Sequence, residues 1–289
     1  MSAPLRSIGR AVAVVCSDAK GRAGVIIVSL FIVIAVFGPW IAPYDADDGS
    51  FAQSTGPGSA HWLGTTAAGQ DVLSQVLAGA RVSVSVGLLA GALATAIAVV
   101  IGLTWGYTRS ITGDVLNFLV NLFLVIPALP LMIVIAAYAQ SGGLTVIVLV
   151  IVITGWAWGA RVLRSQTQTL RSRDFVTAAR FSGERAPRIA FWEILPNMTS
   201  LIVANFFAAA TAAVIAEAGL EFLGLGDTTT VSWGTMLFWA QNSDALLTGQ
   251  WVLLLAPGLC IAVFAAAMTL IIFGVDGLSN PRLREARSR

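Results

Sequence analysis

Residues 115–160 read VLNFLVNLFLVIPALPLMIVIAAYAQSGGLTVIVLVIVITGWAWGA, a run of 46 residues without one charged side chain. A helix needs about 20 apolar residues to cross the roughly 30 Å hydrocarbon core of a bilayer. The run is therefore long enough for two membrane-spanning helices, and the polar, glycine-containing stretch at 140–143 (QSGG) is a suitable break between them. These residues indicate an integral membrane protein.

Other charge-free runs of the chain are each long enough for one span. They cover residues 23–44, 82–108, 194–216 and 245–275. With two spans in the run quoted above, the sequence predicts six membrane-spanning helices. The composition agrees, because charged residues make up 11% and apolar residues 57% of the 289 positions, whereas soluble domains carry about 25% charge. The first run is longer than the apolar core of a cleaved signal peptide, so it is predicted to be a retained helix.

The basic residues lie almost entirely on one side of the six predicted spans. Of the 17 basic residues, 16 fall before the first span, in the second-to-third turn, between the fourth and fifth spans, or in the tail, and Arg81 falls on the other side. Because basic loops stay in the cytoplasm, both termini are predicted to be cytoplasmic. The net charge of +2 therefore reflects membrane topology and not nucleic-acid binding.

The sequence excludes several kinds of catalytic site. Lys20 is the only lysine and is not followed by Ser or Thr, so the phosphate-binding loop of many ATPases is missing. His61 is the only histidine, and Cys16 and Cys260 lie far apart. A His/Cys metal site, a Ser/His/Asp triad and a disulfide are therefore not expected, and no cofactor is expected in this chain. His61, beside Trp62 in an outer loop, is expected to have an ordinary interfacial role.

Few charged groups fall inside the predicted spans, and such groups would mark a proton or ion path. Glu193, Glu217 and Asp276 are placed at helix ends. Their position weakens the case for a proton-coupled carrier. Glu217 and Glu221, at the outer end of the fifth span, are the remaining candidates for a functional role, against simple interfacial placement.

Small residues and prolines are expected to shape the helix packing. Pairs of glycines spaced four apart allow helices to approach closely, and they occur at 87 and 91, 102 and 106, and 155 and 159. Pro127 and Pro130 in the third span, and Pro257 in the sixth, are predicted to kink their helices or to interrupt the hydrogen-bond ladder.

The segment 161–196 cannot cross the membrane, because it holds seven arginines and each costs about 2.5–3.5 kcal/mol at the bilayer centre. Within it Asp174 is a plausible N-cap, 175–182 a short helix and Gly183 its stop. One side of this helix carries small or apolar residues at helical spacing, namely Phe175, Ala178, Ala179 and Ser182. Such a helix, flanked by Arg180, suits a groove on another protein. It equally suits a surface of anionic lipid head groups, and the residues alone do not decide between them.

The same segment resembles a known sequence motif. Thr177-Ala178-Ala179, then Gly183, then Leu195-Pro196 is similar to the EAA loop of bacterial ABC importer permeases. In that family the loop is a coupling helix seated in a cleft of the ATPase subunit. This chain departs from the pattern at Thr177, where the family has Glu.

Further motifs narrow the resemblance to the oligopeptide/dipeptide (peptide/nickel) permeases, and within them to the second, C-type subunit. They are HWLGT at 61–65, GQDVLS at 69–74, GAR at 79–81, FLGLG at 222–226, SWG at 232–234, DGL at 276–278 and NPRLR at 280–284. That family usually has Arg at the position of Gln70. The resemblance runs nearly from end to end of the chain.

The resemblance implies an all-α integral membrane protein with the six-helix type I ABC importer fold and a cytoplasmic coupling helix. Along the chain this gives a cytoplasmic segment at 1–22, a first transmembrane helix at 23–44, an extracytoplasmic loop at 45–80, a five-helix core at 81–276 with the coupling loop at 161–196, and a basic cytoplasmic tail at 277–289. The protein would lie in the bacterial plasma membrane.

It also implies partners and site residues. The partners would be a second homologous permease subunit, one or two ATPase subunits that bind ATP and Mg²⁺, an extracytoplasmic peptide-binding protein and membrane lipid. The residues expected to couple to the ATPase are Asp174, Phe175, Thr177, Ala178, Ala179, Arg180 and Gly183. Those expected to dock the binding protein are Asp71, Arg81 and Glu221. The resemblance leaves the cargo open among dipeptides, longer peptides, glutathione-like molecules and nickel, and the residues that line the path are not identified. A stand-alone secondary transporter or channel is the main alternative, and a membrane enzyme is a weaker one.

Overall fold

The computed structural model describes residues 18–139 and 143–279. In this part of the chain the regular structure is helical, apart from an isolated bridge between Thr65 and Asp71, so the predicted all-α fold is confirmed. The long helices are α2 (Ala19–Ile41), α3 (Val72–Tyr107), α4 (Ile111–Val125), α5 (Ala128–Tyr138), α6 (Leu144–Arg171), α9 (Thr199–Phe222) and α11 (Val252–Ser279). The short ones are α7 (Asp174–Phe181), α8 (Ala186–Arg188) and α10 (Trp233–Asn242).

The helices agree with six predicted spans when one of the spans is broken. Five of the helices are long and apolar enough to cross a membrane, and α4 and α5 form a pair bent by 90° that passes the same test together. The bend falls at Pro127, the N-cap of α5, where a missing N–H ends the ladder of α4. Pro130 lies in the first turn of α5, where no N–H is needed, and α11 continues through Pro257. Of the predicted break at 140–143, residues 140–142 lie outside the described residues.

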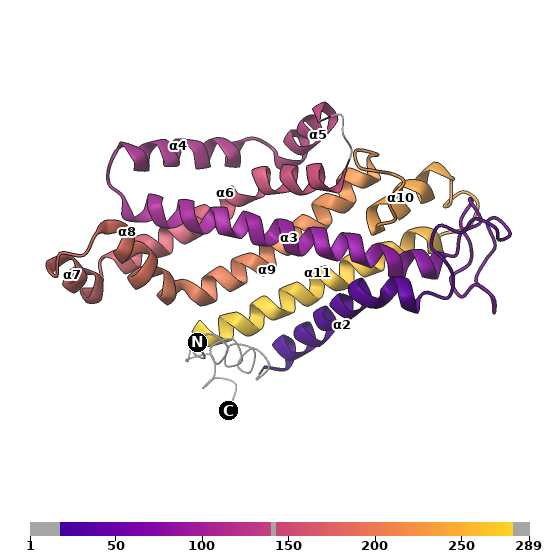
Figure 1. Cartoon of the computed structure of the whole chain (residues 1–289), viewed down its shortest axis with the longest axis horizontal. Coiled ribbons are helices and arrows are strands. Elements are labelled where there is room, and N and C mark those ends of the chain that lie inside the picture. The colour runs from indigo at the N-terminus through magenta and orange to yellow at the C-terminus, as the bar shows by residue number, and fades with distance from the viewer. Residues whose placement is uncertain (1–17, 140–142, 280–289) are drawn as a thin grey trace.

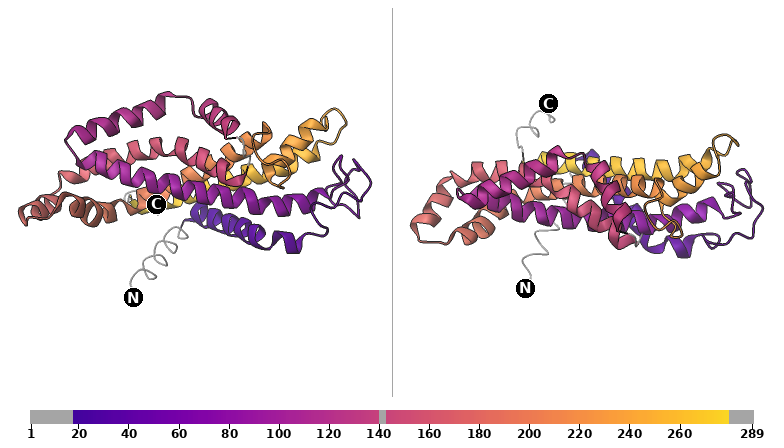
Figure 2. Two further views of the ribbon diagram at one scale, coloured as in Figure 1. Left: turned by 45° about the horizontal axis from the view of Figure 1, so that its top comes forward. Right: turned by 90° about the horizontal axis from the view of Figure 1, so that it is seen from above.

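Helix α3 is the centre of the bundle. It packs against α6 and α9 on one side and against α2 on the other, and α2 also packs against α11 (Figure 1). The broken pair α4 and α5 runs along the opposite edge, next to α6 (Figures 1 and 2). An aromatic cluster fixes the α2–α11 side, where the ring of Phe31 lies 5.6 Å from those of Trp233 and Phe264 in edge-on contact.

Glycines of α3 set how closely its neighbours approach. A Cβ at Gly91 would lie 2.7 Å from the backbone of Ala210 in α9, and one at Gly106 would lie 2.6 Å from Thr167 in α6. The predicted close packing is therefore present at these positions. In the third pair only Gly159 is tight, because no atom lies within 4 Å of a Cβ at Gly155.

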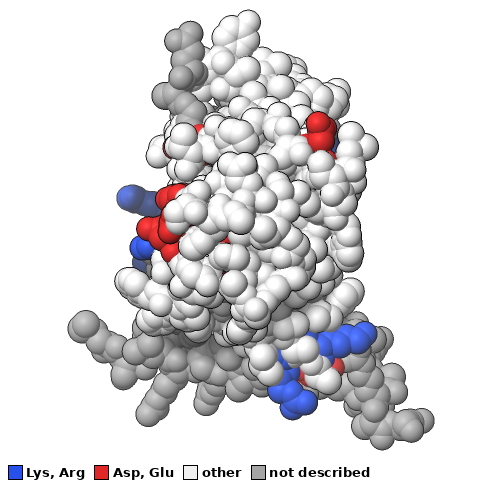
Figure 3. Space-filling view, turned by 90° about the vertical axis from the view of Figure 1, so that its right-hand side faces the viewer, with Lys and Arg blue, Asp and Glu red and all other residues white. Residues whose placement is uncertain are grey.

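The basic segment 161–196, which was predicted as a coupling loop, is largely helical. Helix α6 continues to Arg171, and a π-helical turn (Ile189–Ile194) and a 3₁₀ turn (Leu195–Met198) lead directly into α9. Only the part around α7 and α8 turns away from the bundle, at the left end in Figure 1. We call this end the basic end, and the opposite end, formed by residues 42–71 and α10, the outer end. Seen from the outer end, most of the surface carries no charge, and acidic side chains gather in small patches (Figure 3).

Candidate coupling helix and outer pocket

Helix α7 begins one residue earlier than the sequence suggests. Its N-cap is Arg173, whose carbonyl accepts from the N–H of Thr177 at 3.1 Å. The prediction of Asp174 as N-cap is therefore wrong, because Asp174 is the first helical residue and its side chain caps nothing. Its carboxylate still lies in the first turn, where the helix dipole favours negative charge.

The predicted stop at Gly183 is confirmed. Gly183 has φ +80°, in the left-handed region that favours glycine. Its N–H donates to Arg180 O at 3.0 Å, and the N–H of Glu184 donates to Ala179 O at 3.1 Å. These two bonds form a Schellman motif, which fixes the direction in which the chain leaves α7.

The two sides of α7 differ from the predicted face. Val176 is fully buried and Ala179 is half-buried in a cluster that includes Ile189, so both pack against the chain itself. The exposed side carries Ala178 together with Phe175 and Phe181, whose exposed fractions are 38% and 88%. The face available to a partner therefore contains Phe181 in place of Ala179.

Polar contacts hold α7 to the bundle. The Arg180 guanidinium lies 5.3 Å from the ring centre of Tyr107 at the end of α3, and its Nε donates to the Tyr107 hydroxyl at 3.3 Å. The Thr177 hydroxyl donates to Arg173 O at 3.3 Å. Arg180 therefore anchors α7 to the end of α3. Thr177, which stands where the family has Glu, uses its hydroxyl in a hydrogen bond with a carbonyl at the start of α7. Together with Val176 these contacts make α7 a small element fixed to the bundle, with an apolar face turned outward.

At the outer end, the HWLGT and GQDVLS motifs build one loop. Asp71 is the N-cap of α3, and its carboxylate accepts from the Ser74 N–H at 2.8 Å and from the Ser74 hydroxyl at 2.7 Å. His61 Nδ1 lies 2.8 Å from the other Asp71 oxygen, and its ring is 5.0 Å from that of Tyr44 and 4.7 Å from that of Phe51. His61 thus ties the loop to the start of α3, which is more than the interfacial role expected for it.

Glu217 and Glu221 are buried, with exposed fractions of 0% and 2%, so both side chains lie inside the protein and not at its surface. The Ser83 hydroxyl of α3 donates to Glu217 at 3.1 Å and accepts from the Trp233 N–H at 3.1 Å. The Ser232 hydroxyl donates to Glu221 and also caps α10 in a capping box. Burying a carboxylate is costly unless it is hydrogen-bonded, and these bonds join α3, α9 and α10 in one polar junction.

The sequence contains a pattern that indicates this junction, and a search for charge-free runs does not reveal it. Two carboxylates spaced four apart lie on one face of a helix, here in an otherwise charge-free span. The Ser-Trp-Gly motif supplies their partner Ser232, and a Cβ at Gly234 would lie 2.7 Å from a Glu221 oxygen. A buried acid pair beside a capping serine could have been predicted from these residues.

Of the three residues expected to dock a binding protein, the structure leaves one at the surface. Arg81 is exposed, whereas Asp71 and Glu221 are 1% and 2% exposed and support the outer end from within. A direct docking contact therefore stays a prediction for Arg81, and the other two can act on docking only through the loops they hold.

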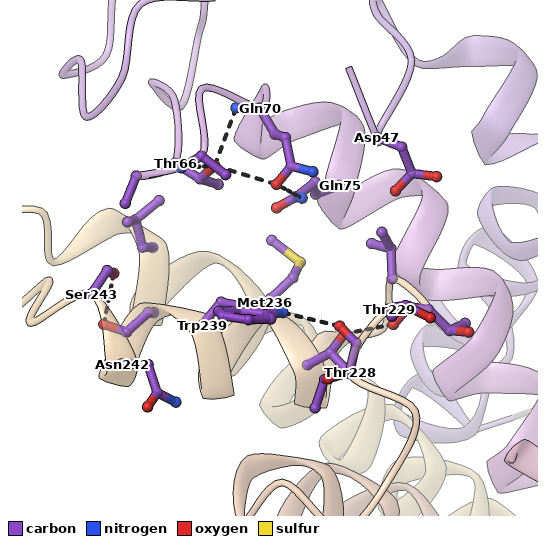
Figure 4. A pocket seen from close by; sticks show the side chains of 17 residues that line it. Asp47, Thr66, Gln70, Gln75, Thr228, Thr229, Met236, Trp239, Asn242 and Ser243 are labelled. Carbon is purple, nitrogen blue, oxygen red and sulfur yellow. Dashed lines mark hydrogen bonds between the residues drawn. The ribbon is translucent and has the colours of Figure 1, made fainter. Parts of the chain in front are cut away.

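A pocket of about 620 Å³ opens at the outer end, between the loop before α3 and α10. Figure 4 shows Thr66, Gln70 and Gln75 on one wall, facing Met236 and Trp239 of α10. Its walls are held by bonds within each side: Gln75 Nε2 donates to Gln70 Oε1 at 2.9 Å, and Trp239 Nε1 donates to a loop carbonyl at 3.0 Å. The pocket is lined mainly by uncharged side chains, so it suits an uncharged part of a partner.

The loop that closes this pocket on the α9 side is ordered by Asp227. The Thr229 hydroxyl and N–H, with the Thr230 hydroxyl, donate to its carboxylate. These hydrogen bonds lower the pKa of Asp227 below its ordinary value, so the carboxylate stays ionised and continues to hold the loop in mildly acidic medium.

Replacing Ser232 with alanine should destabilise the outer end by about 2–4 kcal/mol. The loss of an N-cap costs about 1 kcal/mol, and a buried carboxylate oxygen left without its donor costs about 1–3 kcal/mol more. Thermal unfolding and limited proteolysis of the α9–α10 loop would measure the effect. Ser243→Ala is the matched control, because Ser243 lies at the other end of α10 and its hydroxyl donates to Ala240 O, a carbonyl of the same helix. Equal stability of the two variants would contradict the role given to Ser232.

Comparison with known proteins agrees with this arrangement. Residues 98–285 match the family described as binding-protein-dependent transport system inner membrane component. The chain belongs to this family. It is the family of the type I ABC importer permease fold, so the predicted fold is confirmed. Residues 21–57 match the N-terminal transmembrane domain of oligopeptide transport permease C, as the resemblance to C-type subunits predicted.

Individual relatives cover nearly the whole chain. The oligopeptide transport system permease protein OppC of Mycobacterium tuberculosis (strain H37Rv) is 32% identical over 260 residues, which are 89% of this chain and 86% of the relative. OppC of Bacillus subtilis is 30% identical over 93% of this chain and 88% of its own length. The glutathione transport system permease protein GsiD of Shigella flexneri is 34% identical over 89% of this chain and 84% of its own length. The chain is thus a multi-pass membrane protein of a permease family.

Proposed function

We propose that this chain is the second permease subunit of an ATP-driven peptide importer and forms half of its translocation path. The observation that supports this most directly is α7, which presents Phe175, Ala178 and Phe181 outward from a chain whose sequence has no phosphate-binding loop. An exposed apolar face on a fixed helix suits the groove of a partner. The partner would be an ATPase subunit that holds ATP and Mg²⁺. The relatives named above for oligopeptide transport support a peptide cargo.

The proposed mechanism is mechanical. Closure of the ATPase subunits would move α7, and the contacts of Val176 and Arg180 would pass this movement to the π-helical turn and to the end of α3. Since α3 packs along both α6 and α9, it would shift the outer end as well. This is coupling between distant sites through a rigid element with two positions.

The orientation follows from the same proposal. The basic end would be cytoplasmic, with both chain termini on that side, and the outer end would receive an extracytoplasmic binding protein at Arg81 and the neutral pocket. Single cysteines placed at Ser182 and Ser54, in a chain whose native cysteines are replaced by serine, would test this. A membrane-impermeant maleimide added to intact cells should label the cysteine at 54 and leave the one at 182 unlabelled. The reverse pattern would contradict the orientation.

Reconstitution tests the function itself. Vesicles that contain this chain, the second permease subunit, the ATPase subunits and the binding protein should accumulate peptide only when ATP is present. Omitting this chain should abolish the uptake and the stimulation of ATP hydrolysis by the loaded binding protein. Uptake of equal rate without this chain would contradict the proposal.

The two buried carboxylates are an observation that would favour the rival function, a proton-coupled carrier. A proton-coupled carrier needs a buried titratable group, and the junction of Glu217 and Glu221 supplies two. Their serine partners favour a structural role, because each carboxylate accepts a hydrogen bond that ties α9 to a neighbouring element. The chain reconstituted alone, with a proton gradient imposed, separates the two functions, since peptide movement under these conditions would favour the carrier.

A further inference from the structure

A second cavity, of about 490 Å³, lies at the basic end between the α3–α4 turn and the second half of α6. Its lining includes three arginines, Arg109, Arg164 and Arg171. The Arg164 guanidinium lies 3.8 Å from the ring centre of Trp105, and its Nε is buried without a hydrogen-bond partner in residues 18–139 and 143–279. Arg171 donates to Tyr107 O at 2.9 Å. Uncharged groups therefore hold two of the arginines in place around the cavity.

The positive charge of this cavity is not balanced by the chain. Among the described residues, the salt bridges are those of His61 with Asp71 and of Arg188 with Glu184, so none of the three arginines has a carboxylate within 4 Å. Of the described residues that line the cavity, Asp114 is the only acid. Like charges gathered in a partly buried site repel one another, and an anion bound between them would remove this cost.

An apolar stripe runs away from the cavity along α4. The stripe has the spacing of one helix face and consists of Ile111, Val115, Phe118, Leu122 and Val125, with exposed fractions of 79%, 51%, 66%, 42% and 80%. The helix starts at the cavity, since Ser110 and Gly113 also line it. Fifteen residues of helix extend about 22 Å, which is enough to cross one leaflet of a bilayer whose apolar core is about 30 Å thick.

We propose that this cavity binds the phosphate head group of an anionic phospholipid, whose acyl chains lie along the exposed face of α4. A basic pocket between membrane helices suits such a head group. The adjoining stripe favours a lipid over a free anion, because a free phosphate would leave the apolar wall without a role. The proposal depends on the cavity lying at a membrane surface and not on the coupling of the chain to ATPases.

Native mass spectrometry of the full chain in detergent, titrated with phosphatidylglycerol or phosphatidylcholine, tests the proposal. The wild type should retain phosphatidylglycerol in preference to phosphatidylcholine. Arg109→Gln/Arg164→Gln should bind phosphatidylglycerol on the order of 30-fold more weakly, since each arginine contributes about 1 kcal/mol to anionic lipid binding. Arg109→Gln alone should show a smaller loss in a chain of intact fold, because Arg109 is exposed. Arg185→Gln, an exposed arginine outside the cavity, should bind as the wild type does.

Further binding measurements identify the ligand. Phe118→Ser should weaken phosphatidylglycerol binding but leave the binding of inorganic phosphate unchanged, because Phe118 belongs to the stripe and not to the cavity. Binding of phosphate as tight as that of the lipid, with no effect of Phe118→Ser, would overturn the lipid and leave a free-anion site. Equal retention by the double variant and Arg185→Gln would overturn the site. Loss of phosphatidylglycerol only when the second permease subunit is added would show that a protein covers the stripe. This result would also overturn the proposed lipid site. None of these readouts involves transport, so their failure leaves the proposed function untouched.

Discussion

Replacing Ala178 with tryptophan should nearly abolish peptide uptake and the stimulation of ATP hydrolysis by the loaded binding protein. Ala178 is exposed in the middle of the apolar face of α7, between Phe175 and Phe181. A bulky side chain in a fitted contact costs about 1–3 kcal/mol, which corresponds to a loss of roughly 5-fold to 150-fold in affinity for the ATPase. Uptake in vesicles and co-purification of the ATPase subunits would measure both consequences.

The fold of this variant should be unaffected, because the Ala178 side chain is exposed in the described part of the chain. Ala178→Ser is the matched control, since it keeps the side chain small at the same position and should retain uptake. Ala179→Trp should behave differently, because Ala179 is half-buried against the cluster of Val176 and Ile189. It should lower thermal stability as well as uptake. Normal uptake by Ala178→Trp would contradict a docking role for α7.

Substituting Gly183 tests the backbone geometry at the end of α7 separately from the contacts of its exposed face. No atom lies within 4 Å of a Cβ at this position, but its φ is +80°. Gly183→Ala should therefore act by straining the end of α7, at a cost of about 1–2 kcal/mol, and should reduce uptake less than Ala178→Trp. Gly183→Asn, which tolerates this φ better, should recover part of the loss. Equal uptake by wild type and Gly183→Ala would show that the exit direction of the chain is unimportant.

The number of spans and the place of α7 were predictable because both depend on local patterns. Charge-free length decides whether a segment can cross a bilayer, and a glycine after a short amphipathic stretch ends a helix. The 90° bend at Pro127 was only partly predictable. Proline ends a hydrogen-bond ladder wherever it occurs, but the angle between the two pieces depends on what packs against them, as the uninterrupted α11 at Pro257 shows.

The site residues were less predictable where their role depends on contacts distant in sequence. Glu217 accepts a hydrogen bond from Ser83, which is 134 positions away, so this contact, unlike the acid pair itself, could not be predicted from a local pattern. The position of both acids near a helix end was predicted, but their burial was not, because three elements that are distant in sequence close over that end. Ala179 was assigned to the partner face for a similar reason. The side of α7 that faces its own bundle is set by Tyr107 and the π-helical turn, and not by α7 itself.

Replacing Gly91 with leucine should strongly destabilise the chain, because α3 and α9 cross there with their backbones in contact. A Cβ alone would lie 2.7 Å from the nitrogen and Cα of Ala210, which are backbone atoms that cannot turn aside. Since overpacking costs about 1–3 kcal/mol or more for small additions, the full side chain should destabilise the chain by more than about 3 kcal/mol. Unfolding in mixed micelles by increasing SDS, followed by circular dichroism, would measure this loss of stability.

Gly155→Leu is the matched control, because Gly155 also lies in a membrane helix but has open space at its Cβ. This variant should be neutral or slightly stabilised through helix propensity. If both variants unfolded at the same SDS fraction, the close α3–α9 crossing would be refuted, and with it the path by which α3 is proposed to carry motion from α7 to the outer end.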